Sequence, residues 1–365
     1  MNSEAPSRTK SLFITLKEYC GKELLFVDEP RGQKPSKPLV QLREWLTENR
    51  AGRRSGYMNE EAFLKAYCSY YLPLHLPEVY WIFEQATARA WTLEPVTKLL
   101  DIGCGPGTAT LSYLLFCEHN KLTPPKEIHL VDTSKAALAL ARDLALVLAP
   151  DAQVHMHRVD LRNTRQLTEL TRKFGRSVDL VLMSHVLNEF GSGPRTRESK
   201  AEFIDRILLS CCDEHGHLLV IEHPLRSPTM DLMTLRDELT EKGAVIVAPC
   251  PARTTSCPML RGSAGWCYAQ PPRTEARERE IAPWDKAIGR LLGIEISHPG
   301  FSYLLIGMQP TEKLPTHTAI AIGDESSGMI CNGKMIKHST VPYRGAYLER
   351  SPEEASNPPK KPNVR

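Results

Sequence analysis

The stretch Asp101-Ile102-Gly103-Cys104-Gly105-Pro106-Gly107 decides the fold of this 365-residue chain. A short apolar segment, 96–102, leads into it, and a stretch that is predicted to be helical, 108–118, follows it. A strand, a glycine loop and a helix in this order form the first unit of a doubly wound α/β sheet, where ligands bind at the carboxyl ends of the strands. The glycines let the backbone turn sharply and approach a ligand without hindrance from Cβ atoms.

Beyond the loop, apolar strand-like segments alternate with helix-like segments. Strands are predicted at 96–102, 128–131, 154–159, 178–183, 216–222, 244–247 and 301–308, and helices at 108–118, 135–148, 201–209 and 230–241. This alternation favours a mostly parallel sheet with helices on both faces. We therefore expect an α/β fold with a doubly wound, seven-stranded, Rossmann-like sheet.

An aspartate stands at or next to the end of each of the first three strands, namely Asp101, Asp132 and Asp160. A dinucleotide-binding loop has the pattern G-x-G-x-x-G and holds a pyrophosphate, whereas this loop has the pattern G-x-G-x-G after an aspartate. A carboxylate repels a pyrophosphate but suits the amino group and the sulfonium of S-adenosylmethionine. At the second strand a carboxylate can accept both ribose hydroxyls, and at the third a side chain can reach the adenine amine.

The order of these features resembles the class I methyltransferases over about residues 95–225, with further strands near 245 and 305. The predicted cofactor-binding residues are Asp101, Gly103, Gly105, Gly107, Asp132, Asp160 and Ser184. Ser184 opens the segment Ser184-His185-Val186-Leu187-Asn188-Glu189, where such enzymes place groups that face the transferred methyl. His185, Asn188 and Glu189 are the catalytic candidates, although the segment lacks the acceptor motif of enzymes that methylate nucleic-acid amines. A Rossmann-like domain that has lost its ligand is the alternative.

Three of the ten cysteines, Cys250, Cys257 and Cys267, lie within eighteen residues beside several prolines, between the sixth and seventh strands. Thiolates are soft ligands that suit zinc or an iron–sulfur cluster, and four are normally needed. Cys331 is the natural fourth ligand, so we predict a metal site on Cys250, Cys257, Cys267 and Cys331. For the other six cysteines we expect small buried apolar side chains. A cytosine-C5 nucleophile at Cys250 is less well placed, because in those enzymes the cysteine follows the fourth strand.

Composition sets limits on the rest. The hydrophobic content of 41%, the charged content of 24% and the net charge of +3 are those of an ordinary soluble protein. No apolar run reaches the length of a membrane span, and neither a secretory signal nor a presequence is evident, so we expect an intracellular protein with no membrane association. The predicted divisions are a helical region at 1–94, the sheet domain at 95–310 with a Cys-rich insertion at about 248–272, a β-rich segment at 311–350 and a disordered tail at 351–365. Within the first region, helices are predicted at 40–48, 59–71 and 77–91, with a break at Pro73 and Pro77.

Beyond the general methyltransferase pattern, the chain resembles one family, the ribosomal small-subunit methyltransferase-like proteins of bacteria and mitochondria. The matching segments are 100–108, Leu187-Asn188-Glu189, Val220-Ile221-Glu222, Ala248-Pro249-Cys250-Pro251, Cys257-Pro258 and Gly265-Trp266-Cys267. The resemblance covers about residues 55–350, and its specific part is the set of cysteines. It implies a 4Fe–4S cluster on Cys250, Cys257, Cys267 and Cys331, with zinc as the alternative metal.

The resemblance also implies contact with the small ribosomal subunit and its rRNA. Two functions follow from it, an rRNA methyltransferase or a non-catalytic assembly factor that uses the same fold as a scaffold for RNA and protein. A small-molecule methyltransferase is a weaker reading, because it leaves the cysteine insertion unexplained. We expect a monomer in a bacterial-type cytoplasm, with the mitochondrial matrix as the alternative compartment.

Overall fold

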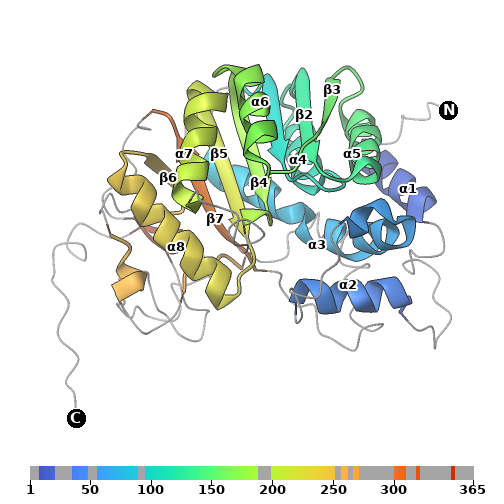
Figure 1. The fold of residues 1–365 in the computed structure, drawn as a ribbon, viewed down its shortest axis with the longest axis horizontal. Coiled ribbons are helices and arrows are strands. Elements are labelled where there is room, and N and C mark those ends of the chain that lie inside the picture. The colour runs from blue at the N-terminus through green and yellow to red at the C-terminus, as the bar shows by residue number, and fades with distance from the viewer. Residues whose placement is uncertain are drawn as a thin grey trace, which may run out of the picture.

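The computed structural model describes residues 8–20, 35–47, 56–88, 95–187, 199–250, 256–261, 266–270, 300–309, 318–320 and 347–349. Its centre is a seven-stranded sheet of order β3-β2-β1-β4-β5-β7-β6 (Figure 1). The strands are β1 (Lys98–Ile102), β2 (Glu127–Asp132), β3 (Gln153–Arg158), β4 (Val178–Ser184), β5 (Cys212–Glu222), β6 (Val245–Ala248) and β7 (Ser302–Gly307). The pairs among β1 to β5 are parallel, and β7 is antiparallel to both of its neighbours, β5 and β6. The predicted doubly wound sheet is therefore confirmed.

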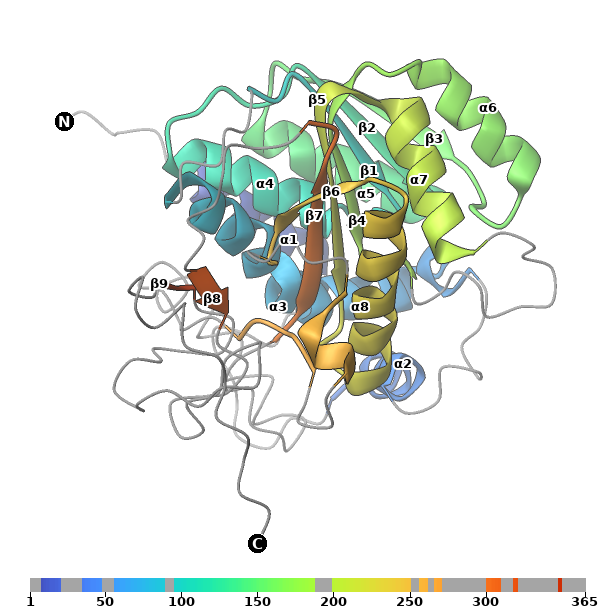
Figure 2. The same ribbon diagram turned by 90° about the vertical axis from the view of Figure 1, so that its left-hand side faces the viewer.

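Successive residues along each central strand are buried in two different apolar cores, one on each face of the sheet. Leu99 packs into the first core with Leu180, while the next residues along the same strands, Leu100 and Val181, pack into the second. This alternation is the period-two pattern of a sheet that is covered on both sides. Helices stand on either side of the sheet when it is viewed from its β6 edge (Figure 2).

The first core is covered by α4 (Thr108–His119) and α5 (Lys135–Leu148), and the second by α6 (Thr164–Phe174), α7 (Lys200–Cys211) and α8 (Arg226–Glu241). Side-chain caps begin three of these helices, because Ser134, Asn163 and Ser199 each accept a hydrogen bond from a backbone amide in the first turn. The sequence analysis does not predict α6, although its Asn163 cap and the left-handed Gly175 at its end are typical helix boundaries.

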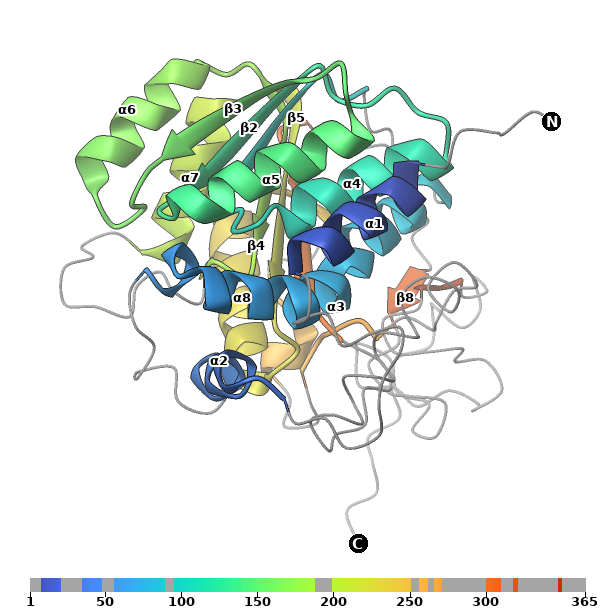
Figure 3. The same cartoon turned by 90° about the vertical axis from the view of Figure 1, so that its right-hand side faces the viewer.

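The N-terminal helices are α1 (Arg8–Cys20), α2 (Lys37–Thr47) and α3 (Glu61–Ala88). The sequence analysis places no helix at α1, yet Leu12, Leu16 and Cys20 are buried at helical spacing, and α1 lies along α4 and α5 (Figure 3). The amide of Arg8 donates to Glu118 of α4, and its side chain donates to the carbonyl of Leu148 at the end of α5. The spacing of these buried apolar residues was the available signal for the helix, which packs against α4 and α5.

The predicted break at Pro73 and Pro77 is wrong, since both prolines lie inside the single helix α3. Ser112 of α4 contacts the backbone of this part of α3, since its hydroxyl donates to the Leu76 carbonyl and accepts from the Tyr80 amide at 2.8 Å. These two bonds connect α3 to α4 beside Pro77. Burial of α3 on nearly all sides outweighs the local cost of the prolines.

Two short strands, β8 (Thr318–Ile320) and β9 (Tyr347–Glu349), pair in an antiparallel manner apart from the main sheet. Most of the predicted β-rich segment and all of the predicted disordered tail lie outside the described residues. Within the described part of the chain, no helix is both long and apolar enough to cross a membrane.

Candidate cofactor site

The glycine loop lies between the carboxyl end of β1 and the start of α4. Gly103, Gly105 and Gly107 have φ values of 73°, 52° and 87°, a left-handed conformation that side chains with a Cβ adopt only at a cost. The amides of Gly103 and Cys104 donate to the carbonyl of Val131 at 2.8 and 3.0 Å, which fixes the loop against β2. The predicted loop therefore adopts the tight turn for which its glycines are suited.

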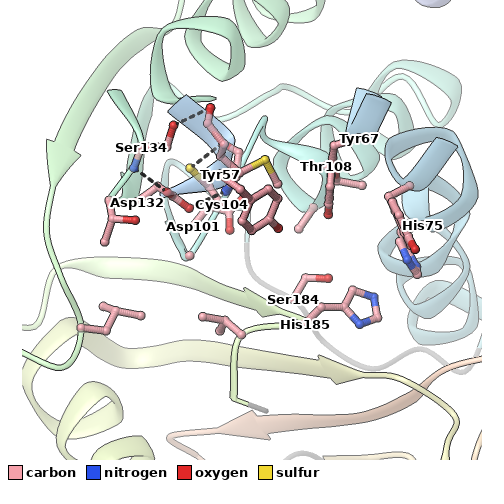
Figure 4. A pocket seen from close by; sticks show the side chains of 18 of the residues that line it. Tyr57, Tyr67, His75, Asp101, Cys104, Thr108, Asp132, Ser134, Ser184 and His185 are labelled. Carbon is pink, nitrogen blue, oxygen red and sulfur yellow. Dashed lines mark hydrogen bonds between the residues drawn. The ribbon is translucent and has the colours of Figure 1, made fainter. Parts of the chain in front are cut away.

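A cavity of about 300 Å³ opens at this loop, a size within the usual range for small-molecule sites. All the predicted cofactor residues line it except Gly107. The Cα atom of Gly107, the last glycine of the loop, packs against Ala141 of α5 instead. A Cβ on Gly105 would have no neighbour closer than 4.0 Å, the Met58 Cε atom, so this glycine leaves open space on the cavity side. Figure 4 shows Asp101, Asp132 and Ser184 arranged around it.

Asp132, at the end of β2, connects the second strand to the glycine loop. Its Oδ2 atom accepts a hydrogen bond from the Gly105 amide at 2.9 Å, and its Oδ1 atom accepts one from the Ser134 amide at 2.8 Å. Burial raises the pKa of this carboxyl, and the hydrogen bonds from Ser134 and Gly105 act in the opposite direction. The amide and the hydroxyl of the neighbouring Thr133 also lower this pKa.

Asp101 is the most deeply buried of the three aspartates. Its Oδ2 atom accepts from the Thr110 amide at 3.2 Å and from the Thr110 hydroxyl at 2.6 Å, while its Oδ1 atom has no partner among the described residues. Burial raises the pKa of Asp101 to about 7 in spite of these hydrogen bonds. A cation in the cavity would favour the ionised form of this carboxyl.

Two further buried hydroxyls on the cavity wall, those of Tyr71 and Thr108, also have no partner within the described parts of the chain. Buried polar groups without a hydrogen bond are uncommon in folded proteins, and a polar ligand would satisfy them. Together with Asp101 Oδ1, they make this cavity suitable for a molecule that carries a cation, hydroxyls and amines. S-adenosylmethionine has all three.

Asp160 lies at the rim of the cavity, after β3. Its two carboxylate oxygens each accept from the Arg162 guanidinium at 2.9 Å, and this pairing lowers the pKa of the aspartate. The carboxylate is more than a third exposed, so the ion pair is accessible to a ligand.

The N-terminal helices close the cavity from the side opposite the sheet. Leu46 of α2, the short helix η3 (Tyr57–Asn59), and Tyr67 and Tyr71 of α3 all contribute to its wall. The η3 turn is docked on the start of α5, because Ser134 donates to the Met58 carbonyl at 3.0 Å and the Asn59 side chain accepts from the Lys135 amide at 3.1 Å. This role of the N-terminal region was not predicted from the sequence.

Of the three catalytic candidates, His185 lines the cavity, whereas Asn188 and Glu189 lie outside the described residues. His185 directly follows β4 in a left-handed conformation, φ 58°. Its Nε2 atom lies 2.9 Å from Oε2 of Glu78, a buried residue of α3, and the other oxygen of Glu78 lies 2.7 Å from Nδ1 of His75. Burial alone would raise the pKa of Glu78, but the imidazoles of His185 and His75 lower it to about 2.

Sequence reasoning missed His75, Glu78 and His223. A histidine and a glutamate three residues apart inside an otherwise apolar helix were the available signal for the first two. His223, which follows β5 directly and also lines the cavity, adjoins the segment Val220-Ile221-Glu222 that was noted for the resemblance.

The six cysteines that were expected to be small buried side chains, Cys20, Cys68, Cys104, Cys117, Cys211 and Cys212, are all buried. The other described cysteines gather beside α8. Cys257 packs with Met233 and Met259, and Cys267 packs against the same group, while the Asp237 side chain accepts from the Cys257 amide. Cys250 interacts with Arg236, the residue before Asp237. Cys331 lies outside the described residues.

The strand order, the antiparallel β7 and the cavity at the glycine loop define a class I methyltransferase fold. The chain belongs to the Rsm22 family, whose model, described as mitochondrial small ribosomal subunit Rsm22, matches residues 61–313. No curated protein matches the sequence.

Solved structures of methyltransferases share the general architecture at low identity. A candidate RNA methyltransferase from Pyrococcus horikoshii is 12% identical, and the match covers 74% of this chain and 96% of that protein, with a TM-score of 0.35. The magnesium protoporphyrin IX methyltransferase of Synechocystis, with bound S-adenosylhomocysteine, is also 12% identical, with 75% and 100% coverage and a TM-score of 0.36. The fold assignment rests on the strand order and the loop, and these similarities add nothing about function.

Proposed function

We propose that this protein binds S-adenosylmethionine in the cavity at the ends of β1, β2 and β4 and acts on, or with, the small ribosomal subunit. The observation that carries the cofactor assignment is the hydrogen bond from the Gly105 amide to Asp132, the residue that is expected to bind the ribose. This bond holds Asp132 against the glycine loop, close to the Asp101 oxygen that has no partner among the described residues. The ribosomal assignment rests on membership of a family described as mitochondrial small ribosomal subunit. The same description favours the mitochondrial matrix over a bacterial cytoplasm.

When bound, S-adenosylmethionine supplies a methyl group on a sulfonium, whose transfer is a direct displacement that depends mainly on alignment. Asp132 would orient the ribose, Asp160 would reach the adenine, and Asp101 would offset the positive charge. Ser184 would line the side of the cavity where the acceptor enters, together with His185. The N-terminal region, proposed as a helical unit over 1–94, would exclude water by covering the cavity.

An alternative is a non-catalytic assembly factor that keeps the cofactor fold as a scaffold. The observation in its favour is that Nε2 of His185, the described base candidate, is bound to the buried Glu78 carboxylate, which leaves only Nδ1 of this ring to act as a base. In this alternative the protein would bind small-subunit rRNA and proteins without transferring a methyl group.

One experiment separates these functions. Cells that lack the protein are complemented with the wild type or with Gly105→Arg, which would fill the cofactor cavity. An enzyme requires the cavity, so Gly105→Arg should fail to restore methyl incorporation from labelled cofactor into small-subunit rRNA and should fail to restore small subunits. If the variant restores small subunits fully, the scaffold function is supported. If neither form sediments with small-subunit particles on a sucrose gradient at low salt, the ribosomal assignment is rejected.

We further propose a 4Fe–4S cluster on Cys250, Cys257, Cys267 and Cys331. The grouping of the three described cysteines beside α8, with Arg236 adjacent to Cys250, supports this proposal. A cluster there would connect the Cys-rich insertion to the segment at 311–350, which we propose as a separate β-rich unit of a monomeric protein. Zinc would suit the same thiolates.

Anaerobic purification tests the cluster directly. The wild type should be brown and contain about four irons per chain, and Cys257→Ser and Cys331→Ser should lose both. The buried Cys211, on α7, provides the matched control, because Cys211→Ser should keep the iron. A colourless preparation with one tightly bound zinc would reject iron, and full retention of metal in Cys331→Ser would remove Cys331 from the ligand set.

A further inference from the structure

Three imidazoles meet at the inner end of the cofactor cavity, and each comes from a different element. His75 belongs to α3, His185 follows β4 and His223 follows β5. One nitrogen from each ring lies within 4.8 Å of the others, and the ring centroids are 4.2 Å apart for His75 and His185 and 4.3 Å apart for His185 and His223. Among the residues that the structure describes, no other group of three metal-binding side chains comes this close together.

Glu78 determines which nitrogens of two of these rings can act as ligands. A carboxylate only accepts hydrogen bonds, so the atoms that face it, Nδ1 of His75 and Nε2 of His185, carry the ring protons. The opposite atoms, Nε2 of His75 and Nδ1 of His185, then carry the lone pairs. A buried carboxylate that orients imidazoles through their far nitrogens is the usual outer partner of a metal-binding histidine.

Electrostatic repulsion favours neutral rings, the form in which imidazole binds a metal ion. The single carboxylate of Glu78, only 2% exposed, can offset the charge of one imidazolium, and further protonated rings at this separation would repel one another. His185 also has a left-handed backbone, which is uncommon for a residue with a Cβ. Glu78 accounts for the positions of His75 and His185, and a shared ion would account for the convergence of all three rings.

We propose that His75, His185 and His223 bind one divalent transition-metal ion, with Glu78 as the residue that positions two of the ligands. Three imidazoles with one open position form a recurrent zinc site, and imidazole also suits iron, copper and nickel. Two nitrogens that lie about 2.1 Å from one tetrahedral ion are about 3.4 Å apart, so the rings need to close by roughly an ångström. All three rings line the cavity. The open position would face the space beside Ser184, which lies next to His185 in Figure 4, and would take water or a heteroatom of a bound molecule.

This site is distinct from the proposed cysteine site, because its ligands are all nitrogen and lie at the cofactor cavity instead of beside α8. The two can therefore be separated with Co²⁺ as the probe. Thiolate ligands give cobalt a strong near-ultraviolet charge-transfer band that imidazole ligands do not, while both give visible bands in tetrahedral geometry. X-ray absorption on zinc-loaded protein adds the distances, about 2.0 Å for nitrogen and about 2.3 Å for sulfur.

The experiment uses the full-length chain after removal of metal with a chelator. Wild type should bind one more equivalent of Co²⁺ than His185→Gln or His223→Gln, and the lost equivalent should lack the charge-transfer band. Glutamine is close in size to histidine and its amide can still donate to Glu78, so the fold should persist, as checked by circular dichroism and melting temperature. His215, an exposed histidine at 57% exposure, provides the matched control, since His215→Gln should bind as much cobalt as wild type.

Glu78→Gln separates positioning from ligation. If Glu78 orients the ligands, this variant should still bind the extra equivalent but about 10–100-fold more weakly, with the same visible bands. Equal cobalt stoichiometry and affinity in wild type, His185→Gln, His223→Gln and Glu78→Gln would overturn the proposal. The same holds if zinc-loaded wild type shows sulfur ligands alone.

Discussion

The Asp132 carboxylate accepts a hydrogen bond from the Gly105 amide at 2.9 Å, and this single bond joins the end of β2 to the turn of the glycine loop. A residue that was expected only to bind a ligand is therefore also part of the structure that shapes the ligand site. The same carboxylate accepts a hydrogen bond from the Ser134 amide, so it fixes the position of the loop relative to the start of α5. Substitution of Asp132 should then affect the site in two ways at once.

We expect Asp132→Ala to weaken S-adenosylmethionine binding at least about tenfold, or roughly 1.4 kcal/mol, by calorimetry. The ribose loses an acceptor, and the amides of Gly105 and Ser134 lose theirs. Asp132→Asn should be no better, because its amide nitrogen would face one of these two N–H groups and cannot accept. Asp143, an exposed aspartate of α5, provides the control, and Asp143→Ala should bind as wild type does. Unchanged affinity in both Asp132 variants would exclude Asp132 from the site.

Two glycines of the same loop should respond in opposite ways to substitution. A Cβ on Gly103 would lie 2.5 Å from Val186 Cγ2, and the residue has a left-handed φ of 73°. Gly103→Ala should therefore lower the free energy of unfolding by about 2–4 kcal/mol. Gly105→Arg has open space instead and only the backbone cost of its φ of 52°, so it should fold with a smaller loss of stability while its side chain fills the cavity and its charge repels the cationic cofactor.

Denaturant unfolding and calorimetry on the two variants test this contrast. The Gly103→Ala loss should shrink in part in the double variant with Val186→Ala, because the 2.5 Å contact with Val186 Cγ2 is removed while the 2.9 Å contact with Cβ of residue 186 and the backbone strain remain. A stable Gly103→Ala, or tight cofactor binding by Gly105→Arg, would show that the loop has a different conformation in solution.

The parts of the fold that could be predicted are those with local signals. The helix at 135–148 was predicted with its observed bounds, because Ser134 is a strong cap and the alanine-rich sequence favours a helix. The glycine loop and the aspartates at the strand ends are likewise specified by their neighbours in sequence. In α3 the local signal was misleading, because proline predicts a break and only the surrounding packing shows that the helix continues.

The histidine cluster could not be predicted, since its geometry depends on contacts between distant segments. Glu78 and His185 are separated by 107 positions, and they meet only because α3 crosses the end of β4. Their residue types are common in sequence, and no spacing connects them. The cofactor cavity was missed in the same way on its N-terminal side, where Tyr57 and Met58 close a site whose recognisable motif lies elsewhere.

The Ser112 hydroxyl should stabilise the turn of α3 between Leu76 and Tyr80. Ser112→Ala leaves the Tyr80 amide and the Leu76 carbonyl without this partner in a buried place, which costs about 1–3 kcal/mol in the free energy of unfolding. Thr168→Ala, on the exposed face of α6, should change it by less than about 0.5 kcal/mol. If Ser112→Ala is as stable as wild type, the hydrogen bonds of the helix itself are sufficient and the hydroxyl contributes nothing.

Asp101 should make both stability and cofactor binding depend on pH. Its pKa is raised from 3.8 to about 7 by burial, so between these values the folded protein keeps a proton that the unfolded chain has lost. The stability from this group is therefore fully present below about pH 4 and is lost as the pH rises through about 7. Asp101→Asn stays neutral throughout and keeps an oxygen that can accept from Thr110.

The advantage of Asp101→Asn over wild type in the free energy of unfolding should therefore grow by about 2–3 kcal/mol between about pH 5 and pH 8. Cofactor binding should show the opposite preference, because the cationic sulfonium favours an ionised Asp101. Wild-type affinity for S-adenosylmethionine should rise with pH between about 6 and 7, and the rise should be smaller for S-adenosylhomocysteine, which lacks the sulfonium charge. Asp101→Asn should bind weakly at every pH. Parallel pH profiles of stability for wild type and variant would show that Asp101 is ionised in the free protein and that its carboxyl is better solvated than the structure indicates.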